Sequence, residues 1–183
     1  MLYHSIGKSD LALAVAAHAN EILSFLEKTP HLYLPEILSN LASVNAFSGN
    51  FKEAEFYINL LDEHGIRSDI SIDRKAQLVI STVEVYFAIR TLDSKRLIMA
   101  RERHEKSGWN FTTINEDYFY EYVGSYIETM NSEDCSKRED FDSSQIQDQS
   151  IGNVMRVMEI DILSLCKDFR GFETSLNQLI KMV

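Results

Sequence analysis

The stretch Asn50-Phe51-Lys52-Glu53-Ala54 has a near copy late in the chain, Gly171-Phe172-Glu173-Thr174-Ser175. In both, a small or turn-forming residue precedes Phe, and apolar residues at helical spacing continue the segment. A long stretch with the same helical periodicity also precedes each copy. A turn that recurs between two amphipathic helices is typical of helical-hairpin repeats. The pattern predicts an all-α fold, in which antiparallel hairpins stack into an α-solenoid.

The composition agrees with this fold class. Of the 183 residues, 45% are hydrophobic and 25% charged, and only 2 are Pro and 7 are Gly. An all-β fold needs more residues of the kind that form tight turns, whereas long helices joined by short loops need few. This length allows four to five stacked hairpins in one domain over residues 1–183, and we expect that domain to be part of a longer array.

Helix boundaries follow from caps and breakers. We expect turns near Gly49, Asp93 and Gly171, and turn-forming residues recur at a spacing of roughly 40 residues. Gly65 and Gly108 should end helices, and Thr113 should cap the helix that follows it. The expected helices are about 10–27, 35–47, 51–64, 73–92, 95–107, 113–130, 151–169 and 172–183.

Residues 132–149 break this pattern with a polar, acidic segment. We expect an acidic loop with at most one short helical turn. Phe141 and Ile146 are its only apolar anchors, so it should be the most mobile part of the chain, and its deletion should change stability little.

Charge and cysteine usage limit the partners and the compartment. A net charge of -10 opposes binding to a nucleic-acid backbone by this chain. No apolar stretch is long enough to span a membrane, and the first residues lack the pattern of a signal peptide. Cys135 and Cys166 stand alone, without the spacing of a zinc site or a disulfide framework. Unpaired thiols favour a reducing, cytoplasmic location.

The second hairpin resembles a tetratricopeptide repeat. Leu38, Leu41, Ala42, Ala54 and Ile58 match the large, small and apolar positions of that repeat, with Gly49-Asn50-Phe51 at the turn. The chain departs from the family at Asn45, where the family has Tyr, and in its spacing, since the family repeats every 34 residues or so. HEAT or armadillo repeats fit the spacing better, but the turn favours degenerate tetratricopeptide-like hairpins. The resemblance implies a concave groove that binds a peptide or protein segment.

The groove of such an array is lined by the first helices of its hairpins. At those positions the second hairpin has Asn40, Ser43 and Phe47, and the third has Tyr86 and Arg90. We expect these residues to face one concave, partly exposed surface. Arg90 could hold a partner's carboxylate with its planar fork, although ordinary solvated polar residues would give the same pattern. The paired basic residues of carboxylate-clamp repeats are not reproduced.

Three other groups of side chains have alternative explanations. One helix face carries Tyr118, Tyr122 and Tyr126. These rings either pack in the core or form a stacking surface for a partner. A basic stripe is either a solvated face or a binding surface; it comprises Lys95, Arg96, Arg103 and Lys106. Arg101 and His104 occupy positions that the repeat register turns inward, so burial would require partners for them.

Signatures of catalysis are absent from the sequence, including the nucleophile elbow, the His-Glu-x-x-His zinc motif and the phosphate-binding loop. We therefore expect a non-catalytic protein- or peptide-binding or regulatory module with no cofactor and no metal. The alternative is a structural scaffold or oligomerisation domain of a larger regulator, for example a homodimer through the ends of the array. An enzyme is a distant third reading.

Overall fold

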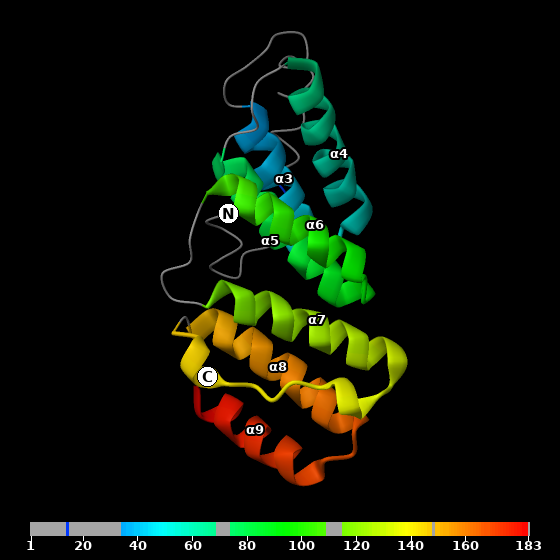
Figure 1. Ribbon diagram of the computed structural model, residues 1–183. Helices are drawn as coiled ribbons and strands as arrows, with labels where there is room; N and C mark the ends of the chain where they lie inside the picture. Colours follow the sequence, from blue (N-terminus) through cyan, green and yellow to red (C-terminus); the bar gives the residue numbers. More distant parts are fainter. Residues whose placement is uncertain (1–13, 15–33, 69–73, 109–114, 148, 183) are drawn as a thin grey trace. The chain divides into compact units, whose positions relative to one another are not determined.

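The computed structural model describes residues 34–68, 74–108, 115–147 and 149–182, together with Ala14. These residues form helices and no β-strand (Figure 1). The α-helices are α3 (Leu34–Phe47), α4 (Phe51–Ser68), α5 (Arg74–Thr91), α6 (Ser94–Ser107), α7 (Glu116–Ser132), α8 (Gln149–Leu165) and α9 (Phe169–Met182). Two short 3-10 helices follow α7: η1 (Cys135–Lys137) and η2 (Ser143–Gln145). The all-α prediction is confirmed for these residues. The expected helix at about 10–27 lies outside them, apart from Ala14.

The chain divides into two compact units. The described part of the first comprises α3, α4, α5 as far as Phe87 and α6 from Met99. The second comprises the remainder of α5 and α6, then α7, α8, α9 and the segment between α7 and α8. The expectation of a single domain over residues 1–183 stays a prediction.

In the first unit, α3 and α4 form the hairpin that the repeated turn predicts. Gly49 has φ +83°, a conformation that glycine adopts without strain, and lies between the two helices as expected. The amide of Asn50 donates to the carbonyl of Asn45 at 2.8 Å, and the carbonyl of Asn50 accepts from the amide of Ala54 at 3.0 Å. The turn therefore closes one helix and begins the next.

The core of this unit joins the α3–α4 hairpin to α5. The five residues that match the tetratricopeptide pattern are each at most 4% exposed and belong to one apolar cluster: Leu38, Leu41, Ala42, Ala54 and Ile58. From α5, Ile80, Val83 and Phe87 complete the cluster, and the rings of Phe87 and Phe51 lie 5.4 Å apart. The apolar periodicity of each helix thus marks the face that it buries.

The helix boundaries expected at Gly65 and Thr113 are wrong, whereas those at Gly108 and Asp93 are confirmed. Gly65 does not stop α4, which continues to Ser68. The N-cap of α7 is Asn115 and not Thr113, because the Asn115 side chain accepts a hydrogen bond from the Tyr118 amide at 3.3 Å. Gly108 does follow the end of α6, with φ +63°, and the chain turns near Asp93 between α5 and α6.

The second unit is built around α8, which contacts both α7 and α9 (Figure 1). Val123 and Ile127 of α7 and Met155, Met158 and Ile162 of α8 are at most 3% exposed. The turn between α8 and α9 is centred on Lys167, which has φ +56°, so the turn expected near Gly171 lies a few residues earlier.

Gly171 belongs to the first turn of α9, where its amide donates to Asp168 Oδ1 at 3.0 Å. A Cβ atom at this position would lie 2.9 Å from Leu163 Cδ2, so a larger residue here would force the Leu163 side chain to shift.

Candidate functional site

The second unit contains an open pocket of about 410 Å³, which we name the α7–α8 pocket. Three polar residues line it: Arg90 from the last turn of α5, Tyr126 from α7 and Asp161 from α8. The other lining residues are apolar: Ile89, Leu92, Met130, Val154, Val157 and Met158. A mostly apolar concavity with a few convergent polar groups is the usual composition of a binding site.

Helical spacing brings the α8 residues to the same pocket. Val154, Val157, Met158 and Asp161 lie three or four residues apart along α8 and so share a face of this helix. Met158 is 2% exposed, whereas Val154 is 51% and Val157 is 46% exposed. The pocket therefore has a buried apolar base and an exposed apolar rim.

Two of the three polar residues of this pocket, Tyr126 and Asp161, contact each other. The hydroxyl of Tyr126 donates to Asp161 Oδ2 at 3.4 Å. Burial raises the pKa of the Asp161 carboxyl above its ordinary value, and the hydrogen bond from Tyr126 partly opposes that shift. The pKa of Tyr126 is also raised, by burial first and then by the Asp161 charge, while Arg90 acts in the opposite direction. Both hydroxyl and carboxyl are thus partly shielded from water.

Arg90 is exposed, and no ion pair or hydrogen bond joins its guanidinium to another residue in the part of the chain that the structure describes. Its five N–H donors match the geometry of a carboxylate. The Arg90 guanidinium, whose N–H donors are unpaired among the described residues, thus lines the same pocket as the apolar rim.

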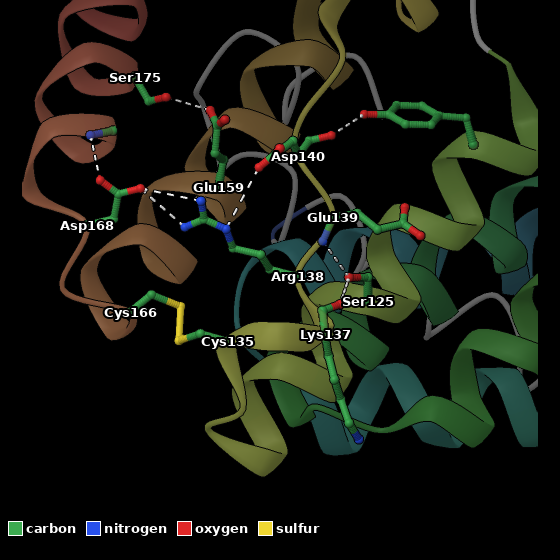
Figure 2. A network of polar contacts seen from close by, with 12 residues as sticks. Ser125, Cys135, Lys137, Arg138, Glu139, Asp140, Glu159, Cys166, Asp168 and Ser175 are labelled. Carbon is green, nitrogen blue, oxygen red and sulfur yellow. Dashed lines mark hydrogen bonds and ion pairs between the residues drawn. A yellow bond between two sulfur atoms is a disulfide. The ribbon is translucent and has the colours of Figure 1, made fainter.

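A second group of polar contacts holds the segment after α7, which we name the strap (residues 133–147). Figure 2 shows its centre, where Arg138 contacts Asp168 at 3.3 Å and Asp140 at 3.8 Å. Toward α7, the Ser125 hydroxyl donates to the Lys137 carbonyl at 2.8 Å and accepts from the Glu139 amide at 3.0 Å. The strap is therefore fastened on both sides.

Aromatic contacts add to this fastening. The Asp142 amide donates to the Tyr118 hydroxyl at 2.6 Å, and the Phe141 ring packs edge-on against Tyr122 at 5.7 Å. The Arg156 guanidinium lies 4.8 Å from the centre of the Phe141 ring. Residues 133–147 form the expected loop, but with two short 3-10 helices where at most one helical turn was expected. They also have many more anchors than the two apolar residues that the sequence indicated.

The strap, α8 and α9 together line an open polar pocket of about 550 Å³. Its charged residues are Arg138, Asp140, Arg156, Glu159, Asp168 and Arg170. Arg156 hydrogen-bonds Gln178 and lies 3.5 Å from Glu159. Glu159 also accepts a bond from the Ser175 hydroxyl at 2.6 Å, which Figure 2 shows. Because its acids and arginines largely pair with one another, we interpret this pocket as a structural network.

Cys135 and Cys166 form a disulfide, with their Cα atoms 5.7 Å apart (Figure 2). The expectation of two unpaired thiols is therefore wrong, and with it the argument for a reducing compartment. The two cysteines are 31 residues apart in sequence, and the packing of the strap against the α8–α9 turn brings them together. An even number of cysteines was the only signal for this pairing in the sequence.

Of the five residues that the sequence assigned to one groove, four belong to the first unit and Arg90 belongs to the second. Phe47 and Tyr86 pack together in the first unit, with ring centres 5.1 Å apart. Asn40 is half-buried and donates to the Glu36 carbonyl of its own helix at 2.8 Å. Ser43 is 1% exposed, so its expected exposure on a groove is wrong, because α3 is buried on nearly all sides. Arg90 belongs to the second unit and lines the α7–α8 pocket.

The tyrosine face of α7 is mainly core. Tyr122 is 1% and Tyr126 is 6% exposed, so the stacking-surface alternative is wrong for these two, and Tyr118 bonds the strap. The site residues predicted from the sequence do not include Val154, Val157 and Asp161. Their helical spacing on α8 was the only signal for them in the sequence.

The basic stripe is partly neutralised. Arg103 of α6 makes two hydrogen bonds to the Asp62 carboxylate of α4, at 2.6 and 3.0 Å. Arg96 lies 4.0 Å from Asp93. His104 is 1% exposed, as its inward register predicts, whereas Arg101 keeps 43% of its side chain exposed and pairs with Glu105 at 3.4 Å. The inward register is therefore wrong for Arg101.

Among the described residues, no group of three or more His, Cys, Asp or Glu side chains is placed to hold a metal ion. None of the described helices combines the length and the hydropathy needed to cross a membrane. No protein-family model matches the chain, and neither a curated protein nor a solved structure matches it. The tetratricopeptide resemblance therefore stays a prediction.

Proposed function

We propose that the chain is a non-catalytic protein- or peptide-binding or regulatory module of tetratricopeptide-like helical hairpins, and that it binds its partner at the α7–α8 pocket. A partner segment would insert an apolar side chain between the exposed valines of α8 and pair a nearby carboxylate with Arg90. The observation that carries this proposal is the unpaired Arg90 guanidinium beside the apolar rim.

The apolar rim supplies affinity. Val154 and Val157 expose about half of their surfaces next to the buried Met158, so covering them removes apolar area from water without any rearrangement of the core. Burying apolar surface contributes roughly 25 cal/mol per Å². A pair of valines on one helix face suits a short apolar segment better than a large flat partner.

The charges supply selectivity. Arg90 favours a partner carboxylate, and Asp161 disfavours a second acidic group in the same pocket. The chain's net charge of -10 works against a nucleic-acid partner, so a protein segment remains the proposed ligand. The expected sequence is one carboxylate flanked by apolar residues.

Selection of peptides from a displayed random library against the whole chain, followed by calorimetry with the selected peptides, tests the proposal. Arg90→Ala should weaken binding by about 1.5 to 3 kcal/mol, the scale of a hydrogen bond to a charged group, or roughly 10- to 150-fold. Val157→Asp should also weaken it, because it places a charge on the apolar rim.

Arg101→Ala is the matched control, since Arg101 is also a partly exposed helical arginine but pairs with Glu105. Equal binding by the Arg90→Ala and parent chains would refute the pocket. So would equal losses in Arg90→Ala and Arg101→Ala, because these would indicate attraction by net charge alone.

A scaffold or oligomerisation role is the second candidate, and α9 carries the observation that favours it. Phe169 is 73% and Ile180 is 64% exposed, and a separation of eleven residues places both on one face of the helix. Sedimentation at several concentrations would test self-association. This role predicts a dimer that Phe169→Ser dissociates, whereas a concentration-independent monomer would remove it.

A cytoplasmic location stays part of the proposal. The redox state of the Cys135–Cys166 pair in cells would test it, since stable disulfides are characteristic of oxidising compartments and cytosolic ones are usually transient.

A further inference from the structure

The strap meets the turn between α8 and α9 at two neighbouring points. The covalent one is the disulfide between Cys135 and Cys166, and the non-covalent one is the ion pair between Arg138 and Asp168 (Figure 2). Both side chains of the ion pair are about one-third exposed, and an ion pair of that exposure contributes little on its own. The disulfide is therefore the strong fastening on this side.

Away from this turn the strap is held mainly by α7, and the Phe141 ring also contacts Arg156 of α8. The Ser125 hydroxyl bonds the backbone on both sides of Arg138, and the Tyr118 hydroxyl accepts from the Asp142 amide. None of these bonds involves α9. Breaking the disulfide would thus leave the strap attached to α7 while its strong link to the start of α9 is lost.

Both cysteines are partly exposed, as direct attack of a dissolved thiol on the disulfide requires. We propose that the Cys135–Cys166 disulfide is a redox-sensitive clamp whose reduction releases the start of α9 from the strap. A dithiol reductant supplies two electrons and two protons. Its thiolate attacks one sulfur, the S–S bond breaks, and a second attack releases the oxidised dithiol and leaves two cysteine thiols.

The release would widen the polar pocket, because the strap forms one wall of it with Arg138, Asp140 and Phe141. Asp168 would keep its bond from the Gly171 amide but lose the covalent support that holds Arg138 beside it. Release of α9 from the strap does not depend on binding at the α7–α8 pocket.

The test follows the reduction of the whole oxidised chain by dithiothreitol, at urea concentrations below the unfolding transition. A reduction rate that is independent of urea supports the clamp, because the native disulfide is then attacked directly. A rate that rises with urea with the slope of global unfolding would overturn it, since the disulfide would then be reduced only in the unfolded chain.

Hydrogen exchange of the reduced parent, and of the chain carrying Cys135→Ser and Cys166→Ser, gives the second readout. Amides of the strap and of the first turn of α9 should exchange about tenfold faster, or more, than in the oxidised chain, with the α3–α4 hairpin unchanged as the internal reference. Unchanged exchange at the start of α9 would overturn the proposal, because the strap would then hold α9 without the bond.

Discussion

Loss of the disulfide should lower the free energy of unfolding of the second unit, and the structure sets the magnitude. Replacing Cys135 and Cys166 together by Ser removes a cross-link between residues 31 apart. The chain-entropy relation gives about 3.7 kcal/mol for a loop of that length. Measured values commonly fall below such estimates, and the strap keeps its bonds to Ser125 and Tyr118. We therefore expect a loss of about 2 to 4 kcal/mol.

The assay is urea unfolding combined with hydrogen exchange, because exchange resolves the two units. The slowest amides of α7 and α8 should lose the full amount, while those of the α3–α4 hairpin should change little. Reduced parent chain should match the double variant, since both lack only the S–S bond.

The two single variants supply the control. Either substitution breaks the same bond, so Cys135→Ser, Cys166→Ser and the double variant should lose nearly equal free energies, a strong departure from additivity. Additive losses would refute the reasoning, since they would show that each side chain acts through its own packing. A double variant within about 0.5 kcal/mol of the oxidised parent would do the same.

Three further predictions concern single side chains of the second unit. The Tyr122 hydroxyl is buried and has no hydrogen-bond partner among the described residues, so Tyr122→Phe should leave the free energy of unfolding unchanged or raise it. Tyr118→Phe is the same chemical change, but it loses the bond from the Asp142 amide and should cost about 0.5 to 1.5 kcal/mol in urea unfolding. Gly171→Ala should destabilise the protein by about 1 to 3 kcal/mol, since its Cβ would lie 2.9 Å from Leu163. Gly152→Ala, whose nearest contact would be at 3.7 Å, should stabilise α8 by roughly 0.5 to 1 kcal/mol. A thermal melt that reverses this order would contradict the packing argument. The pKa of Asp168 is lowered by the bond from the Gly171 amide and then by Arg138. The stability that the Asp168 carboxylate contributes is therefore present above its unfolded pKa of about 3.9 and is lost as pH falls through the lowered value. Asp168→Asn should be less stable than the parent at neutral pH, by a difference that shrinks in acid, and a pH-independent difference would contradict this prediction.

Much of the fold could be predicted from the sequence because it is encoded locally. Apolar residues three and four apart identify the buried faces of α3 and α4, and Gly49 marks the turn between them. Prediction of the helix boundaries fails where a residue that favours a boundary lies within or next to a helix-forming sequence. Gly65 favours a helix end, yet α4 continues through it for three more residues, and the capping position falls on Asn115, two residues beyond Thr113.

The candidate site was less predictable. Arg90 was predicted as a site residue from its position on the first helix of a hairpin, and it does line a pocket. The other polar residues of that pocket are Tyr126 and Asp161, and not Asn40 or Ser43. Burial on nearly all sides of α3 removes Ser43 from any surface. A repeat register assigns faces to helices, but only their packing decides which faces remain exposed.

The sequence by itself determined the helical class, the α3–α4 hairpin and the turns, because each depends on residues within about one helical turn of one another. Tertiary structure alone decided the contacts that join distant segments. The Cys135–Cys166 disulfide spans 31 residues, the Tyr126–Asp161 bond 35 and the Arg103–Asp62 pair 41. No local pattern encodes such a pairing, since it arises only when packed helices bring two surfaces together.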